Sequence, residues 1–157
     1  MRRLALVRHG EAVNSSPRGD HARALTPNGQ NVVARLGSLL VSRGEEWDLI
    51  IHSDAVRAVG TTEILRSSFS GIECHEFSSL YLAGFTQLLS EVAQFDKASS
   101  ILAVGHNPGW SDIAMVLTGS AIGLAPGDCA LMCIPHNGDW VECLGAAGAW
   151  QLEHVRA

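Results

Sequence analysis

The stretch "ALVRHGEAV", residues Ala5–Val13, joins a short apolar run directly to an arginine, a histidine and a glycine. The run itself, Leu4–Val7, is typical of a strand that is buried on both faces. A strand end turning into solvent would account for one charged residue. It does not account for a cation, an imidazole and a conformationally free glycine in succession. We therefore ask whether Arg8 and His9 act together on an anion.

The composition is that of a folded, slightly acidic protein. With 157 residues, the chain has the usual length of one domain, and we expect a single domain over residues 1–157. Hydrophobic residues make up 46% and charged residues only 17%, which argues against disorder. The formal net charge of −5 argues against nucleic acid as a partner.

Hydropathy and cysteine usage bear on the compartment. The nearest candidate for a membrane span, residues 114–134, is broken by glycines, a proline and an aspartate, so no membrane association is expected. The apolar run before Arg8 is too short for a signal-peptide core. The four cysteines form no CxxC pair, which favours reduced thiols. Together these features predict a cytoplasmic protein.

Short apolar runs alternate with longer amphipathic segments. Strands are expected at residues 4–7, 48–52, 72–75, 100–104, 129–134 and 140–144, with a final short strand at 150–154. Helices are expected at residues 27–43, 54–66, 87–95 and 107–117, the first with Thr26 as its N-cap and Pro27 as its first residue. A turn at residues 136–139 would pair 129–134 with 140–144 as a hairpin. The alternation predicts an α/β three-layer sandwich: a mostly parallel sheet, helices on both faces and an antiparallel C-terminal hairpin.

Three polar motifs follow predicted strands. They are Arg8-His9-Gly10-Glu11, the segment from Ser53 to Arg57, and Gly105-His106-Asn107-Pro108. Ligands of open α/β sheets bind beyond the carboxyl ends of the strands, so these motifs are expected to share one rim.

This combination of residue types suits phosphoryl chemistry. The guanidinium groups of Arg8 and Arg57 match phosphate oxygens and stay charged. Nearby cations keep His9 neutral, and a neutral imidazole is a nucleophile. Gly10 allows close backbone approach, and His106 could stabilise charge on the transferred group.

Each motif also has a plain structural reading. His-Gly pairs are common, Asn107 could simply cap a helix, and Arg57 could be a solvated helix residue. Their joint place at three strand ends favours the functional reading.

The stretch "LVRHGEA" resembles the Arg-His-Gly signature of the histidine phosphatase superfamily. With "RALTPNGQ" (residues 23–30), "HSDAVRAVGTTEIL" (52–65) and "VGHNPGWSDIA" (104–114), the whole chain is most similar to the SixA-type phosphohistidine phosphatases, which have the phosphoglycerate-mutase-like fold. The resemblance implies that His9 accepts the phosphoryl group and that Arg8, Arg57 and His106 form the phosphate pocket. It also implies no cofactor, no metal and a role in signal transduction.

Three further residues are candidates for substrate binding. Arg23, in the Arg-x-Leu-Thr motif, resembles a basic contact at the pocket edge, and Gly10 and Asn107 belong to the two histidine motifs. Two positions depart from the family pattern: Asp54 stands where the family commonly has proline, and Gly60 where it has glutamine. We expect Asp54 to cap the helix that begins there. Gly60 is a poorer helix residue than glutamine and removes a polar side chain.

The proton donor is not marked by any motif. Cleavage of a phosphate ester needs a general acid, and Glu11, Glu76 and Glu91 are candidates, with Glu76 the better geometric choice. A phosphorylated imidazole has a labile P–N bond and needs less acid catalysis. This favours phosphohistidine as the substrate.

The sequence is compatible with three functions. The first is a metal-independent phosphatase that acts on phosphohistidine in a protein. The second is a phosphatase of a small phosphomonoester or pyrophosphate. The third is a non-catalytic module that binds phosphate or a phosphoprotein, although such a module would not need both His9 and His106.

Overall fold

Six strands form one sheet in the computed structural model, which describes residues 1–157, in the order β3-β2-β4-β1-β5-β6. The strands are β1 (Arg2–Arg8), β2 (Leu49–Ser53), β3 (Glu73–Phe77), β4 (Ser100–Gly105), β5 (Cys129–Ile134) and β6 (Gln151–Val155). The first four run parallel, whereas β5 is antiparallel to β1, and β6 is antiparallel to β5. The mostly parallel sheet and its antiparallel C-terminal hairpin are thus confirmed.

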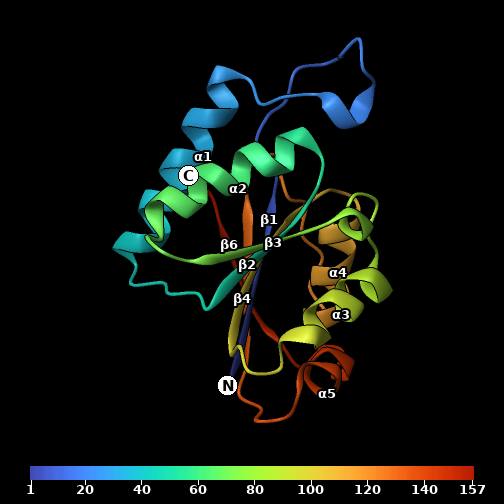
Figure 1. The fold of residues 1–157 in the computed structure, drawn as a ribbon. Coiled ribbons are helices and arrows are strands. Elements are labelled where there is room, and N and C mark those ends of the chain that lie inside the picture. The colour runs from blue at the N-terminus through green and yellow to red at the C-terminus, as the bar shows by residue number, and fades with distance from the viewer.

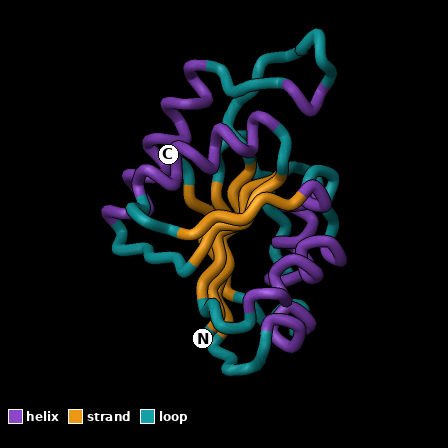
Figure 2. Tube along the Cα trace, viewed as in Figure 1, coloured by secondary structure: helices purple, strands orange, loops and turns teal.

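Helices cover both faces of this sheet (Figures 1 and 2). The helices are α1 (Pro27–Ser42), α2 (Val56–Ser68), α3 (Phe85–Val92), α4 (Gly109–Thr118) and α5 (Trp140–Gly145). One core cluster of 15 buried residues joins the sheet to α1 and α2, and another of 23 joins it to α3, α4 and α5. The three-layer arrangement is confirmed.

The centre of the sheet explains the opening apolar run. Strand β1 lies between β4 and β5, and its residues Leu4–Val7 are fully buried. Leu4 and Leu6 belong to the larger cluster, whereas Ala5 and Val7 belong to the smaller one. This alternation follows from the two-residue period of a strand, and a strand packed on both faces reads as a continuous apolar run. It fixes the position of Arg8 and His9 at the strand's end.

The start of α1 is as predicted. Thr26 is its N-cap, and the Thr26 hydroxyl accepts a hydrogen bond from the Gly29 N–H at 2.9 Å. The loop between β1 and α1 carries a short 3-10 turn, η1 (Asp20–Ala22), and projects beyond the sheet in Figure 1.

The prediction of a strand at residues 140–144 is wrong: this segment is α5. The Asp139 side chain accepts a hydrogen bond from the Glu142 N–H at 2.8 Å, while Glu142 accepts from the Asp139 N–H at 3.2 Å. This reciprocal capping box starts the helix. Trp140 is buried beneath it, and β6 takes the place predicted for 140–144 in the C-terminal hairpin.

Asp54 does not cap α2. The N-cap is Ala55, whose side chain has no hydrogen-bond acceptor. The Ala55 N–H donates to Ser53 Oγ at 3.2 Å. The Asp54 carboxylate instead lies beside His21.

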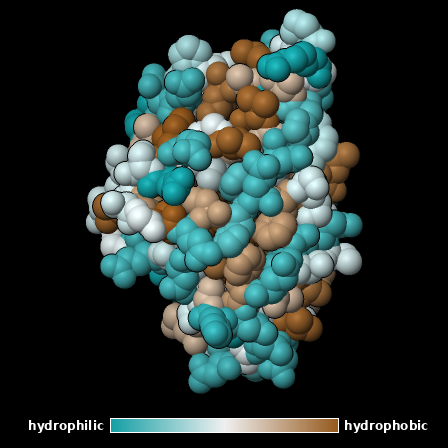
Figure 3. All heavy atoms as spheres, viewed as in Figure 1, coloured by the Kyte–Doolittle hydropathy of each residue, from teal (hydrophilic) through white to brown (hydrophobic).

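Some hydrophobic side chains are exposed at the surface. In the face drawn in Figure 3, small groups of hydrophobic residues lie among hydrophilic ones. The tryptophans are not among the exposed residues, since all four are at most 8% exposed. The four cysteines are unpaired thiols. No helix has both the length and the apolar character to cross a membrane.

Candidate active site

The carboxyl ends of three strands bring the predicted residues together. His9 follows β1 and His106 follows the adjacent β4, and their ring centroids are 5.1 Å apart. Arg57, in the first turn of α2, reaches the same point from the end of β2. Only 8% of His9 and 6% each of Arg57 and His106 are exposed, so the three side chains form a buried cluster.

The orientation of His9 is set by its own backbone. His9 Nδ1 lies 2.8 Å from the Gly10 carbonyl oxygen, which can only accept, so this contact places the ring proton on Nδ1. The lone pair is then on Nε2. The Arg57 Nε–H donates to His9 Nε2 at 3.2 Å. The nitrogen that can attack is therefore turned toward a guanidinium.

Burial and neighbouring cations keep both histidines uncharged. Desolvation, with the charges of Arg57, Arg8 and Arg23, lowers the pKa of His9 to about 4. Desolvation, with the proximity of His9 and Arg57, lowers the pKa of His106 to about 3. Both imidazoles are neutral near pH 7, as the predicted chemistry requires.

This depression links folding to pH. A histidine exposed in the unfolded chain has a pKa near 6.5, so the unfolded state binds more protons than the folded state as the pH falls below that value. The stability that the two neutral histidines contribute is fully present above about pH 6.5. It is lost as the pH falls from there toward the folded pKa values, and each histidine contributes on the order of a few kcal/mol. We expect urea unfolding to show a free energy of unfolding that falls between about pH 7 and pH 5.

His106→Asn should flatten this decline by removing one of the two buried groups. The same substitution at the exposed His136 is the matched control and should keep the wild-type slope. An unchanged slope in His106→Asn would contradict the assignment of His106 as a buried neutral group.

Gly10 is required by the packing of the loop onto α1. A Cβ atom on Gly10 would lie 2.8 Å from Val33 Cγ2 and 3.0 Å from the Gly29 carbonyl oxygen. The Gly10 N–H donates to Thr61 Oγ1 at 3.0 Å, and Thr61 is fully buried on α2. Thr61 thus ties the His9 loop to the helix that carries Arg57. Thr61 lies in the quoted stretch of residues 52–65, but the sequence analysis assigned it no role.

Two polar atoms at this rim are buried without a partner. One is Arg8 Nε, although Arg8 Nη1 donates to the Leu124 carbonyl at 2.8 Å. The other is His106 Nδ1, on the ring whose Nε2 lies 2.8 Å from Ser53 Oγ. Ser53 Oγ accepts from the Ala55 N–H, so its hydroxyl proton is free to bind His106 Nε2. Neutral His106 then carries its proton on Nδ1, and both orphaned atoms are donors.

Asp20 is a site residue that the sequence reading missed. Its carboxylate accepts from Arg57 Nη2 at 3.0 Å, from Arg23 Nη1 at 2.8 Å and from the Tyr81 hydroxyl. Hydrogen bonds from Tyr81 and Arg23, followed by those from Arg57, hold the pKa of Asp20 well below its usual range. The i,i+3 spacing of Asp20 and Arg23 was the available signal. Arg23 therefore reaches the cluster through Asp20.

Asn107 serves the loop. Its Nδ2 donates to the Leu124 carbonyl at 2.8 Å, and its Oδ1 accepts from the N–H and hydroxyl of Ser111. Asn107 thus holds the start of α4 and the segment that also binds Arg8, and its polar atoms are directed into that structure.

The side chains of the acidic candidates bind outside the His9 cluster or lie far from it. Glu11 accepts hydrogen bonds from Thr26 and Asn28 at the start of α1. Glu91 accepts from Ser79 and Gln94. Glu76 is exposed on the edge strand β3, three strand positions from β1, a separation of about 14 Å at the usual strand spacing.

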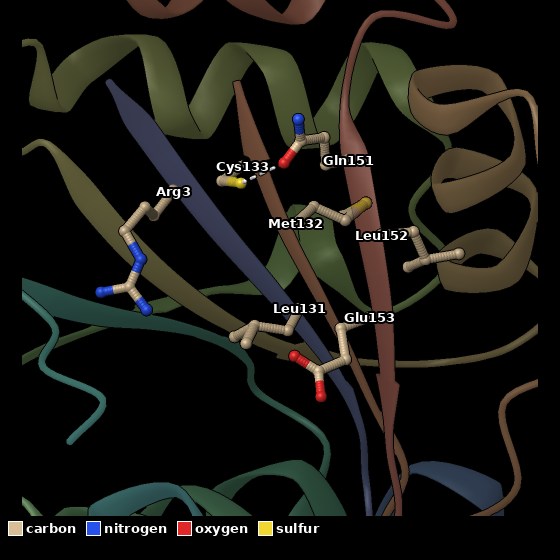
Figure 4. A pocket seen from close by; sticks show the side chains of 7 residues that line it. All are labelled: Arg3, Leu131, Met132, Cys133, Gln151, Leu152 and Glu153. Atoms are coloured by element: carbon tan, nitrogen blue, oxygen red, sulfur yellow. Dashed lines mark hydrogen bonds between the residues drawn. The ribbon is translucent and has the colours of Figure 1, made fainter. Parts of the chain in front are cut away.

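Two hollows differ in their relation to the cluster. A groove lined by residues 81–84, residues 106–109 and Asp112 opens beside His106. Figure 4 shows the other, lined by residues of β1, β5 and β6, including Arg3 and Glu153. Arg3 is near the start of β1, about 20 Å from His9 at the rise of a strand, so this second hollow is separate from the site.

Comparisons with known proteins show the family of the chain. The family model for the histidine phosphatase superfamily (branch 1) matches residues 4–80. An uncharacterized chloroplastic protein of Arabidopsis thaliana is 31% identical over 171 residues, covering 99% of this chain and 78% of that protein.

Solved structures extend the likeness over the whole fold. A protein of Agrobacterium tumefaciens that carries the name of a SixA phosphohistidine phosphatase matches with a TM-score of 0.84 at 24% identity, covering 99% of this chain and 98% of that one. One from Nakamurella multipartitia, under the same name, matches with a TM-score of 0.82 at 27% identity, covering 97% and 93%. The chain has the SixA-type fold, is a phosphatase and belongs to the histidine phosphatase superfamily.

Proposed function

We propose that this phosphatase removes phosphate from phosphohistidine in a partner protein, without a metal ion and through a phosphoryl intermediate on His9. One observation carries the proposal: the unprotonated His9 Nε2 faces the Arg57 guanidinium within a buried cluster. A neutral imidazole nitrogen attacks phosphorus readily, and the neighbouring guanidinium binds the oxygens of the group being transferred.

The remaining residues of the cluster support the same chemistry. Arg8 Nε and His106 Nδ1 are buried donors without partners, and hydrogen bonds to phosphate oxygens would satisfy both. Negative charge on the phosphoryl oxygens is stabilised by such fixed donors. Arg8, Arg57 and His106 thus supply the positive charge and donors that a metal ion supplies in other phosphatases, and this supports the metal-independent part of the proposal.

The leaving group distinguishes a phosphohistidine from an ester. An alkoxide is a poor leaving group, whereas an imidazole leaves readily once its second ring nitrogen is protonated. None of the glutamates considered as general acids forms a hydrogen bond or ion pair with His9, Arg57 or His106. The names carried by the Agrobacterium and Nakamurella proteins support the same substrate class.

An exposed apolar residue beside the site supports a protein substrate. Leu82 follows Tyr81, lines the groove next to His106 and is 85% exposed. Among the large hydrophobic side chains at the surface, Leu82 has the highest exposure, and its place at the entrance of the groove makes it a candidate contact for a protein substrate.

The test compares substrates on one enzyme. We expect kcat/KM for a protein phosphorylated on histidine to exceed that for small phosphomonoesters and pyrophosphate, measured by phosphate release. Leu82→Asp should lower the rate on the phosphoprotein by about tenfold or more through a higher KM, since it removes apolar contact and adds a charge. It should leave the rate on small substrates unchanged.

Val141→Asp places the same charge on α5, where Val141 is 51% exposed, and should leave every rate unchanged. A higher kcat/KM on small esters or pyrophosphate would contradict the proposed substrate and favour a small-molecule phosphatase. An equal effect of Leu82→Asp on small and protein substrates would contradict the role of Leu82 as a docking contact.

A further inference from the structure

One histidine near His9 has no role in the phosphoryl transfer described above. Asp20 is held ionised by its hydrogen bonds, so it cannot donate a proton. The pKa of Tyr81 is raised, chiefly by its hydrogen bond to Asp20, so Tyr81 keeps its proton. His9 and His106 are the neutral nucleophile and a donor to phosphate. The remaining candidate for a proton donor is His21, which is adjacent to Asp20 in η1.

His21 lies at the mouth of the cluster. Its ring packs edge-on against Tyr81 with centroids 4.9 Å apart, and Tyr81 packs edge-on against His106 at 5.4 Å. Proximity to His21 contributes to the lowered pKa of His106. The His21 side chain is 45% exposed, so it faces the solvent side of the site, where a leaving group must depart.

A carboxylate stands behind this imidazole. His21 Nε2 is 3.0 Å from Asp54 Oδ1, although the angle is not that of an aligned hydrogen bond and Oδ1 has no other partner. A carboxylate beside one ring nitrogen orients the imidazole and leaves the other nitrogen free to donate. His21 forms no other hydrogen bond or ion pair, so its Nδ1 is uncommitted. Asp54 is the residue that replaces the proline common in the family.

We propose that His21 is the general acid of this enzyme and that Asp54 positions it. The proposal rests on the proposed function and gives the missing proton a source. In a phosphohistidine, the nitrogen that must be protonated is the ring nitrogen not bonded to phosphorus. That nitrogen points away from His9 toward the mouth of the site, where His21 lies.

The proton balance closes over the two steps. His9 Nε2 forms a bond to phosphorus as the P–N bond of the substrate breaks, and the electron pair of that bond stays on the leaving nitrogen. His21 gives its Nδ1 proton to the second ring nitrogen, so a neutral imidazole departs. Water then attacks phosphorus, the bond to His9 Nε2 breaks, and neutral His21 accepts a proton from the water. Phosphate is released, and His9 and His21 return to their starting states.

A pair of small substrates isolates this proton. Phosphoimidazole needs protonation to leave, whereas its N-methylated cation already carries the positive charge and leaves as neutral methylimidazole. Near neutral pH, His21→Gln should lower kcat/KM for phosphoimidazole by about 100-fold or more, the usual contribution of a general acid. The rate on the methylated cation should be unchanged. Using kcat/KM confines the measurement to formation of the phosphoenzyme.

Asp54→Asn should show the same selectivity with a smaller loss, about tenfold, since it leaves His21 in place. His75→Gln is the matched control, because His75 also pairs with a carboxylate, Glu73 at 2.6 Å, on the edge strand. Equal losses on both substrates in His21→Gln would show a structural role and overturn the proposal. Full activity of His21→Gln on phosphoimidazole would also overturn the proposal.

The outcome remains decisive if phosphohistidine is not the substrate. Phenyl phosphate and 2,4-dinitrophenyl phosphate form an equivalent pair, because the dinitrophenolate leaves without a proton. A wild-type enzyme that cleaves phenyl phosphate but not phosphoimidazole would contradict the proposed substrate. A selective loss on phenyl phosphate in His21→Gln would still support His21 as the acid, and an equal loss on both esters would overturn it.

Discussion

His9→Ala is expected to abolish the phosphoenzyme and to lower kcat/KM by about 10⁴-fold or more, the size of effect seen when a catalytic nucleophile is removed. Arg57 and His106 cannot compensate, because the guanidinium is not a nucleophile and His106 Nε2 is engaged with Ser53. Rapid-quench labelling of the wild type should trap phosphate that is acid-labile and alkali-stable. The variant should trap none.

His52→Ala is the control for His9→Ala. His52 is also a buried histidine at the end of a strand, and its Nδ1 likewise lies close to the next carbonyl, that of Ser53, at 2.9 Å. It is not part of the cluster, so its variant should keep the label. Labelling of His9→Ala, or full turnover by it, would refute the proposed intermediate.

Arg57→Lys is expected to lower kcat/KM by about 10²–10³-fold, because a lysine keeps the charge but loses the fork of donors. Arg57 donates from Nε to His9, from Nη1 to the Asp20 backbone carbonyl and from Nη2 to the Asp20 carboxylate. An ammonium group cannot hold all three contacts. The loss should appear in kcat as well as KM, since these donors act on charge that develops during transfer. Steady-state kinetics on a phosphohistidine protein measures both.

Arg66→Lys is the matched substitution at the exposed end of the same helix and should leave the kinetics unchanged. If Arg57→Lys kept wild-type kcat and KM, charge alone would suffice and the bidentate role of Arg57 would be wrong.

Most of the fold follows from local patterns. The continuous apolar run of β1 predicts a central strand, and Thr26-Pro27 predicts the start of α1. The cluster of Arg8, His9, Arg57 and His106 could be predicted because parallel strands bring their carboxyl ends to one edge. The catalytic roles, the absence of a cofactor and the cytoplasmic location stay predictions.

The errors have physical causes. Residues 140–144 have an apolar pattern too short to separate strand from helix, and the decisive signal was the capping pair Asp139 and Glu142. The sequence could link Asp20 only to Arg23, because its other partners Arg57 and Tyr81 are distant in the chain. Only the folded loop brings these three together.

The contact between Asp20 and Arg57 has a consequence for turnover. Because a carboxylate already binds this guanidinium, we expect phosphate to compete with it for Arg57, so that the net affinity for phosphate is the difference between two pairings. Chloride and other weakly paired anions compete poorly against an intramolecular carboxylate. After hydrolysis, the same carboxylate is expected to pair with Arg57 again as phosphate departs. A strongly cationic site can in this way avoid being trapped by its own product.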